Sequence, residues 1–215
     1  DGVGCVPQGQ TRYSVFSLWD TYRNLHQLMT LVYPERQVDM VRSMIDIYKE
    51  WGWMPKWELF GRETFTMEGD PAIPVITDTW LKGLRGFDIG TAYEAFVKSA
   101  TSKGTDNLMR PDIDPYLEKG YVPLGMYSAD LSGDNSVSHA LEYYIADYAL
   151  SLLASDLGHA EDAERFLAQS LRYKNYYCPA FGTFRPLNAD GTFLEPFNPR
   201  QGENFEPVPG FHEGS

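Results

Sequence analysis

The sequence predicts an all-α protein built from pairs of helices. Apolar residues recur at helical spacing in six stretches, Gly and Pro separate these stretches, and the first helix of each pair is more apolar all round than the second. This alternation of inner and outer helices is typical of an α/α toroid. Three hairpins make about half of an (α/α)6 barrel. A plain α-solenoid is the alternative, although the chain shows no repeated sequence signature.

Composition limits the size of the domain and its partners. The 215 residues fit one domain with a sizeable core. The formal net charge of -12 argues against nucleic acid or an anionic membrane surface as partner. No apolar run approaches the roughly 18 residues that a membrane helix needs. Cys5 and Cys178 do not make a disulfide framework, and whether they pair with each other stays open.

The first helix pair is predicted over residues 14–32 and 34–50. Apolar residues lie on one face of the first helix, and Pro34 ends it. The second helix is amphipathic, as expected for an outer position. The next stretch, residues 51–59, is broken by Gly and Pro, so we do not expect regular helix there. It holds three tryptophans, Trp51, Trp53 and Trp57.

The second and third pairs have clear start signals. Their helices are predicted over residues 71–83, 89–102, 136–157 and 160–177. The expected N-caps are Asp70, Asp88 and Ser136. Residues 104–135 are rich in Gly, Pro and Asp and are predicted to be irregular, apart from a turn of helix near 114–119. After the last helix, residues 181–193 are predicted to form a hairpin with Asp190 and Gly191 in its turn.

Trp19 and Asp20 lie side by side in the otherwise apolar start of the first helix. A carboxylate in such a place needs a hydrogen-bond or ion-pair partner, or it must face a water-filled cavity, because burying it unpaired costs several kcal/mol. One interpretation pairs Asp20 with Arg23 or a loop amide. The other makes the pair a sugar site, with Trp19 as stacking platform and Asp20 accepting hydroxyl hydrogen bonds. The three tryptophans of residues 51–57 are a second candidate sugar-stacking group, with core filling as the competing interpretation.

The sequence offers no metal site of its own. The four histidines show no paired spacing, which makes zinc improbable. They are His26, His139, His159 and His212. Asp112 and Asp114 alternate as in a calcium loop, but the Gly and the distal Glu of an EF-hand are missing, so we expect them to form turns.

Five stretches resemble, in order and approximate spacing, the family-92 glycoside hydrolases, which are calcium-dependent exo-acting α-mannosidases. These stretches are Phe16–Arg23, Met54–Leu59, Gly69–Gly83, Ser136–Asp147 and Phe211–Ser215. The resemblance covers nearly the whole chain and implies an (α/α)6 catalytic domain. In the family this domain follows an N-terminal β-sandwich. We expect that sandwich and the C-terminal half of the barrel to lie outside residues 1–215.

The resemblance also implies roles for three residues, and a fourth, His212, adjoins one of them. Trp19 and Asp20 would lie in the mannose subsite, and Glu213 would be the general acid. His212 is expected either to contact substrate or to stabilise the turn. The catalytic base and most of the calcium shell are expected beyond this chain, so the chain alone is expected to be inactive.

The chemistry is consistent with the role implied for Glu213. Inversion needs a protonated acid at the leaving oxygen and a carboxylate on the opposite face, ~6.5–9.5 Å away. Gly214 permits a tight turn beside Glu213, and aromatic neighbours could raise the pKa of the acid by desolvation. Without the resemblance, a surface glutamate near a chain end is the simpler interpretation. Departures from the family pattern at Ser138–Ala140 and Tyr148 leave the linkage preference open.

The expected function is that of a fragment of an inverting exo-α-mannosidase that removes terminal α-linked mannose from glycans. The expected ligand is a mannose-containing glycan, the cofactor calcium, and the location exported: periplasmic, cell-surface or secreted. The piece is expected to pack against the rest of its own polypeptide. The alternatives are an inverting glycosidase of another (α/α)6 family and a non-catalytic helical carbohydrate-binding or interaction domain.

Overall fold

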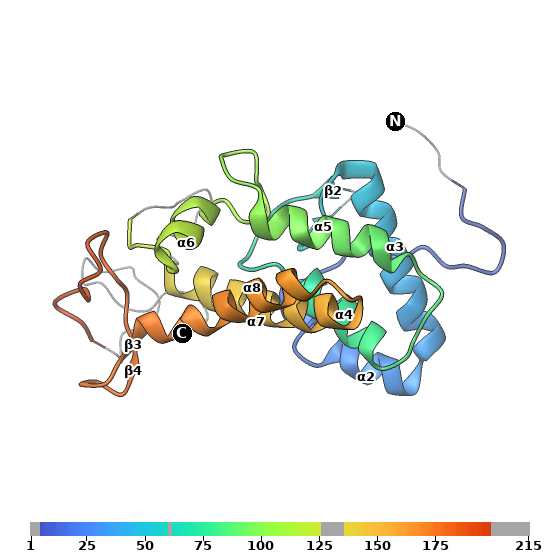
Figure 1. The fold of residues 1–215 in the computed structure, drawn as a ribbon. Helices are drawn as coiled ribbons and strands as arrows, with labels where there is room; N and C mark the ends of the chain where they lie inside the picture. The colour runs from blue at the N-terminus through green and yellow to red at the C-terminus, as the bar shows by residue number, and fades with distance from the viewer. Residues whose placement is uncertain (1–4, 60–61, 126–135, 199–215) are drawn as a thin grey trace.

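The computed structural model describes residues 5–59, 62–125 and 136–198. In these ranges the chain is mostly helical, as predicted, and the described strands form no closed sheet (Figure 1). The helices are α1 (Leu18–Thr21), α2 (Leu25–Val32), α3 (Pro34–Trp51), α4 (Ala72–Leu81), α5 (Ile89–Thr101), α6 (Ile113–Lys119), α7 (Ser136–Asp156), α8 (Ala160–Ser170) and the 3-10 helix η1 (Leu171–Tyr176). The strands are β1 (Glu58–Leu59), β2 (Arg62–Glu63), β3 (Tyr177–Cys178) and β4 (Thr183–Phe184). Each of the two ladders, β1 with β2 and β3 with β4, is antiparallel.

The helices form two layers. In the inner layer, α4 contacts both α2 and α7. The outer helices α3, α5 and α8 each pack against the inner helix that precedes them, and α8 lies along α7 in Figure 1. This arrangement confirms the three predicted helix pairs and the partial (α/α)6 architecture.

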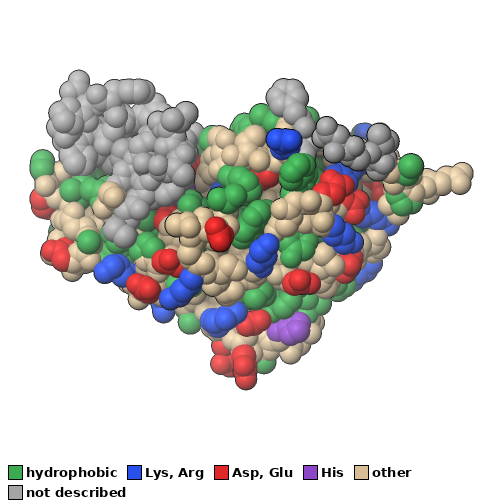
Figure 2. Space-filling model, turned by 90° about the horizontal axis from the view of Figure 1, so that it is seen from above, with side chains coloured by type: hydrophobic (Ala, Val, Ile, Leu, Met, Phe, Trp, Pro, Cys, Tyr) green, Lys and Arg blue, Asp and Glu red, His purple; other side chains and the backbone are tan. Residues whose placement is uncertain are grey.

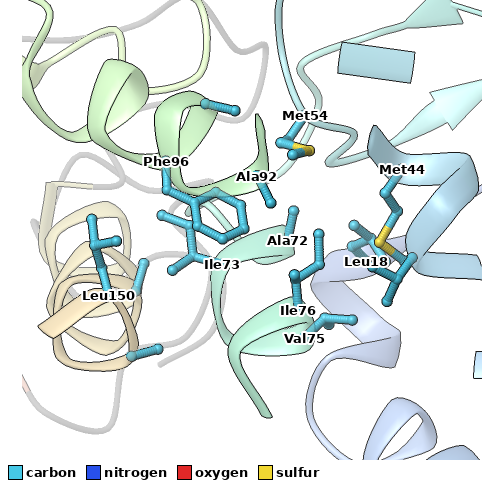
Figure 3. Packing of buried hydrophobic residues seen from close by; sticks show 14 of the residues in the cluster. Leu18, Met44, Met54, Ala72, Ile73, Val75, Ile76, Ala92, Phe96 and Leu150 are labelled. Atoms are coloured by element: carbon cyan, nitrogen blue, oxygen red, sulfur yellow. The ribbon is translucent and has the colours of Figure 1, made fainter. Parts of the chain in front are cut away.

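The main core lies where the two layers meet. Figure 3 shows Ile73 of α4 beside Phe96 of α5, with Leu150 of α7 on the same side, while Ile76 lies beside Val75; all of these side chains are fully buried. Burying each such side chain stabilises the fold by about 1.5–3 kcal/mol. Because α4 is covered by helices on several sides, its sequence is apolar almost all round, as predicted.

A second core cluster surrounds the first half of α7 and is rich in tyrosine. Its buried rings include Tyr116 of α6, Tyr143 and Tyr144 of α7, and Tyr176 of η1. Their hydroxyls find acceptors inside the cluster: Tyr144 donates to the carbonyl of Gly120 at 2.6 Å. These bonds explain how polar tips are buried here without a large penalty.

The first predicted helix, residues 14–32, is broken in the structure. Helix begins only at Leu18, and residues 22–24 form a turn between α1 and α2. Val15 has φ 62°, which takes the preceding segment out of the helical region. Tyr22 is buried although it lies in this turn, so the apolar residues keep their helical spacing across the break. The sequence pattern therefore does not reveal it.

Other differences lie at element ends. The helix predicted over 160–177 becomes 3-10 after Ser170. In the predicted hairpin 181–193, Asp190 and Gly191 do lie in the turn, and Leu187 pairs with Phe193. However, β4 pairs with the preceding strand β3, so residues 177–193 fold back twice. The cap at Asp88 is confirmed, because its carboxylate accepts from the amide of Thr91 at 3.0 Å.

The surface of the described residues is mixed in charge. On the face shown in Figure 2, Lys and Arg side chains alternate with Asp and Glu, with apolar side chains between them. No described helix is long and apolar enough to cross a membrane.

Candidate functional site

The end of α1, the segment before α4 and the first half of α7 meet at one place, which we call the α1–α4–α7 junction. It is defined by Trp19, Tyr22 and Arg23 of the first segment, Gly69 before α4, and Glu142 of α7. The Tyr22 hydroxyl donates to Glu142 at 2.6 Å, and a Cβ placed on Gly69 would lie 2.7 Å from the Cβ of Glu142. In this way the fold brings together segments about 120 residues apart, with a carboxylate at their centre.

A strand-like segment fixes the approach to α1. The amide of Leu18 donates to the carbonyl of Lys56 at 2.9 Å, and the amide of Glu58 donates to the carbonyl of Phe16 at 2.9 Å. Ser17 and Trp57 form an antiparallel bridge between these bonds. This external support matters because α1 has four residues and no side-chain cap, and a single helical turn is unstable alone.

Trp19 and Asp20 differ in how accessible they are at the junction. Asp20 is exposed, and its carboxylate makes no hydrogen bond or ion pair with the described residues. The ring of Trp19 is half-buried, and its indole N–H has no hydrogen-bond partner among them either. The interpretation that Asp20 pairs with Arg23 is therefore wrong. The structure therefore leaves the Asp20 carboxylate available to a ligand, whereas the indole N–H of Trp19 is buried.

Arg23 pairs with Glu142 instead. Its Nη2 lies 3.1 Å from a carboxylate oxygen of Glu142, and its Nε donates to the carbonyl of Trp19 at 3.1 Å. The guanidinium also lies over the Trp19 ring, 4.7 Å from the ring centroid. Arg23 therefore links the predicted stacking platform to the carboxylate of α7.

Burial sets the ionisation of this group of residues. Desolvation raises the pKa of Glu142, while the hydrogen bond from Tyr22 and the charge of Arg23 act in the opposite direction. Burial also raises the pKa of Tyr22, and the negative charge of Glu142 adds to this effect. Tyr22 therefore stays protonated and donates to the carboxylate.

Behind the junction lies a buried ammonium group. Lys56 is fully buried, and its Nζ donates to the carbonyls of Met67 at 3.2 Å and Met109 at 3.0 Å. Burial lowers the pKa of Lys56, and the negative charges of Asp70 and Glu63 oppose this. The two carbonyls tie the segment before α4 to the loop before α6.

Asp70 does not cap α4 as predicted. Its carboxylate instead accepts hydrogen bonds from Ser99 and from Nε of Arg110, the latter at 3.2 Å. Arg110 also binds Asp147 of α7 at 2.8 Å, and Tyr116 donates to the same carboxylate at 2.7 Å. Arg110, Asp70 and Asp147 are all buried, so this network fixes the start of α4 against α7 from within.

Asp112 and Asp114 behave differently from each other. Asp114 accepts from the amide of Gly104 at 3.1 Å, as expected for a loop-forming residue. Asp112 is buried; it accepts from the hydroxyl of Tyr143 at 2.7 Å and lies 3.5 Å from Nδ1 of His139. Its role is therefore a side-chain link to α7, which local sequence could not indicate.

Only one of the three clustered tryptophans lies beside the junction. Trp57 pairs with Ser17. Trp53 packs against Nζ of Lys98, 4.2 Å from the ring centroid, and Trp51 lies under Arg62. The three rings therefore do not form one sugar-stacking surface.

Two predicted site residues, His212 and Glu213, lie outside the described residues. In the described part of the chain, no group of three His, Cys, Asp or Glu side chains is placed to hold a metal ion. The calcium expected from the sequence thus has no fitting donor set here, and its ligands stay a prediction for other residues. Cys5 is exposed and Cys178 buried, and both are free thiols.

A separate polar cleft lies on the outer side of α3. It has a volume of about 650 Å³ and is lined by residues 5–7 and 10–12 together with Arg42, Ser43, Asp46, Lys49 and Glu50. None of its lining residues belongs to the junction.

Glu142, Tyr22 and Arg23 are the site residues that sequence reasoning missed. All three stand inside stretches singled out as motifs, Phe16–Arg23 and Ser136–Asp147. Reading those two stretches as neighbours in space would have paired their charged residues. The contact between them spans 119 positions in sequence, and no local signal marks it.

Comparison with known proteins identifies relatives of this chain. The catalytic-domain model of glycosyl hydrolase family 92 matches residues 3–215. A secreted glycosidase of Arthroderma benhamiae, itself uncharacterized, is 29% identical over 148 residues, which are 66% of this chain and 19% of that protein.

Solved structures resemble the fold closely. The inverting mannosidase BT2199 of Bacteroides thetaiotaomicron superposes with a TM-score of 0.80 at 28% identity, covering 88% of this chain and 25% of that one. The α-mannosidase BT3965 of the same organism, in complex with mannoimidazole, gives a TM-score of 0.82 at 35% identity, covering 95% and 26%. The chain thus spans about a quarter of the length of these structures.

Proposed function

This chain belongs to glycosyl hydrolase family 92, and on that premise we propose that the full-length protein is an inverting exo-α-mannosidase that removes terminal α-linked mannose from glycans. Membership of this family removes the alternative of another (α/α)6 family. The two relatives of solved structure are named as mannosidases, which supports the proposal.

The observation that carries the proposal is the state of Trp19 and Asp20. Both belong to α1, the Asp20 carboxylate is exposed, and the described residues use neither this carboxylate nor the indole N–H of Trp19. An indole face suits the C–H surface of a pyranose, and a free carboxylate accepts hydrogen bonds from sugar hydroxyls. These two groups would hold the terminal mannose, with His212 as a further contact.

In the proposed mechanism Glu213 protonates the leaving oxygen as the glycosidic bond breaks. A carboxylate on the opposite face, expected elsewhere in the full-length protein, removes a proton from the attacking water. No step is assigned to calcium, because the described residues offer no site for it. Residues 1–215 alone are expected to be inactive, since they would hold the acid without the base.

The rest of the catalytic domain is proposed to pack on α7. Its residues Ile145, Tyr148 and Leu152 follow helical spacing and are 41–51% exposed, although α7 belongs to the inner layer. An inner helix with an uncovered apolar stripe is consistent with further helices of the same polypeptide lying against it. The N-terminal β-sandwich is likewise proposed to lie outside this chain.

Export of the full-length protein is proposed as well. Its support is the curated relative from Arthroderma benhamiae, which is named a secreted glycosidase. The proposed location is the periplasm, the cell surface or the medium.

The test is turnover of an aryl α-mannoside by the full-length protein, with and without a calcium chelator. We expect activity that depends on calcium, releases the product with inverted configuration by NMR, and falls about 10²–10⁴-fold in Glu213→Gln. The loss should be least with a good leaving group, because such a group needs little protonation. Glu164→Gln, on the exposed face of α8, serves as the matched control.

Two outcomes would overturn the proposal. Equal turnover by wild type and Glu213→Gln would remove Glu213 from the mechanism. Wild-type protein that hydrolyses no α-mannoside would remove the mannosidase assignment.

A further inference from the structure

Glu142 has no role in the mechanism above, yet its carboxylate is held by two side chains at the centre of the junction. Its side chain is 13% exposed, and burial raises its pKa, so holding it here costs free energy. Two groups from a segment about 120 residues away compensate this cost, the Tyr22 hydroxyl at 2.6 Å and Arg23 Nη2 at 3.1 Å. A buried charge that is held by two side chains from a distant segment indicates a functional role for Glu142.

Both partners of Glu142 belong to the segment that carries Trp19 and Asp20. Tyr22 closes the last turn of α1, since its amide donates to the carbonyl of Leu18 at 2.9 Å. Helix α1 is too short to hold its own geometry. Residues 56–58 support its start through backbone hydrogen bonds. Glu142 supports its end from α7.

Arg23 extends this support to the Trp19 ring. One guanidinium binds Glu142 with Nη2, binds the carbonyl of Trp19 with Nε, and covers the Trp19 ring at 4.7 Å. Fork geometry lets arginine make such directed contacts at once, and each holds the next in place. If Glu142 loses its charge, Arg23 loses its ion pair, and its guanidinium is no longer held over the indole ring of Trp19.

The backbone before α4 leaves room for this arrangement. Gly69 has φ +83°, and any Cβ there would lie 2.7 Å from the Cβ of Glu142. The absence of a side chain at this position lets Glu142 pass between α4 and α1. Three elements are therefore shaped around one carboxylate.

Arg23 and Tyr22 both donate to Glu142, which suits a fixed acceptor and not a group that exchanges protons with substrate. We propose that Glu142 is a positioning residue for the sugar subsite, holding Trp19 and Asp20 in place through Tyr22 and Arg23. The identity of the sugar bound at the subsite rests on the proposed function. The effect of Glu142 on the geometry of α1 does not depend on it.

The test uses the full-length protein and a mutant cycle of Glu142→Gln, Trp19→Ala and the double variant. For an aryl α-mannoside we expect Glu142→Gln to raise KM about 10- to 100-fold, the size of one charge-assisted hydrogen bond. We expect kcat to change little, because binding of ground state and transition state weakens together. The double variant should be no worse than Trp19→Ala alone, since Glu142 acts through the Trp19 segment. Glu164→Gln is the control.

A second readout needs no activity. In protein labelled with 5-fluorotryptophan, Trp19→Phe identifies the ¹⁹F resonance of Trp19. Glu142→Gln should shift or broaden that resonance and leave the others in place. Tyr22→Phe removes only one hydroxyl and should shift the same resonance by a smaller amount. It tests the contact with Glu142 independently if Glu142→Gln folds poorly.

Independent, multiplicative losses in the cycle would overturn the proposal, and so would a Trp19 resonance that is identical in Glu142→Gln and wild type. If the wild-type protein hydrolyses no α-mannoside, the proposed function fails. The resonance of Trp19 then still decides whether Glu142 holds α1.

Discussion

Gly69 and Glu142 touch across the junction so closely that a Cβ on the glycine would lie 2.7 Å from the Cβ of the glutamate. Real side chains do not approach at this distance, so either the start of α4 or the α7 backbone would have to move. The contact therefore fixes the spacing of α4 and α7, two inner helices that meet at the junction beside the candidate sugar-binding residues Trp19 and Asp20.

Gly69→Ala should destabilise the protein by about 2–4 kcal/mol. About 1–2 kcal/mol comes from the left-handed conformation at φ +83°, and the rest from overpacking against Glu142. Gly83→Ala is the matched control, because Gly83 has φ +85° and no atom within 4 Å of the added Cβ. Urea unfolding of both variants measures the difference. Equal losses would show that the contact with Glu142 is not restrictive.

Arg110→Met should cost about 3–5 kcal/mol of stability, because it leaves two buried carboxylates, Asp70 and Asp147, without their cation. Burial opposes the charge of Arg110, but Asp147 and Asp70 outweigh this and hold the pKa of Arg110 above its ordinary value. The control is Arg165→Met, which breaks an exposed pair with Asp162 and should cost about 0–1 kcal/mol. Similar thermal unfolding of the two variants would contradict the account of the network.

His26 should make stability depend on pH. Its ring is buried between Thr21, 2.9 Å from Nε2, and Gln37, 3.0 Å from Nδ1. Burial lowers the pKa of His26, so the unfolded chain binds the proton more readily than the folded protein. The stability contributed by the neutral ring is present above pH about 6.5 and is lost as the pH falls toward the lower folded pKa.

The measurement is the free energy of unfolding of wild type and His26→Gln between pH 7.5 and about 5. We expect the advantage of wild type over His26→Gln to shrink as the pH falls. The exposed His159 provides the control variant His159→Gln. An advantage that is constant over this range would show that His26 does not titrate differently on folding.

The sequence predicted what depends on local pattern. Helical periodicity located α3, α4, α5, α7 and the short α6, and the turn at Asp190 and Gly191 followed from turn chemistry. The inner and outer roles of the helices followed from how far round each one is apolar, because burial on two sides leaves no polar face.

The errors at the candidate site involve contacts that are distant in sequence. Asp70 has the position of an N-cap, but its carboxylate binds Arg110, which is 40 residues away. The first helix breaks after α1, where Tyr22 and Arg23 turn to meet Glu142. Trp19 and Asp20 were proposed because aromatic and acidic neighbours suit a sugar, and their role stays a prediction. Glu142 was missed because its importance depends on a helix pairing that periodicity does not reveal.

The most direct test of the sugar site is kcat/KM of the full-length protein for an aryl α-mannoside in wild type, Asp20→Ala and the control Asp106→Ala. Asp20 is exposed and unused by the described residues, so its removal should leave folding intact. The account predicts that kcat/KM falls about 10- to 100-fold or more in Asp20→Ala, the loss of at least one hydrogen bond from sugar to carboxylate, with Asp106→Ala unchanged. Asp20→Ala that hydrolyses the mannoside as well as wild type would contradict the assignment of the junction as the sugar site.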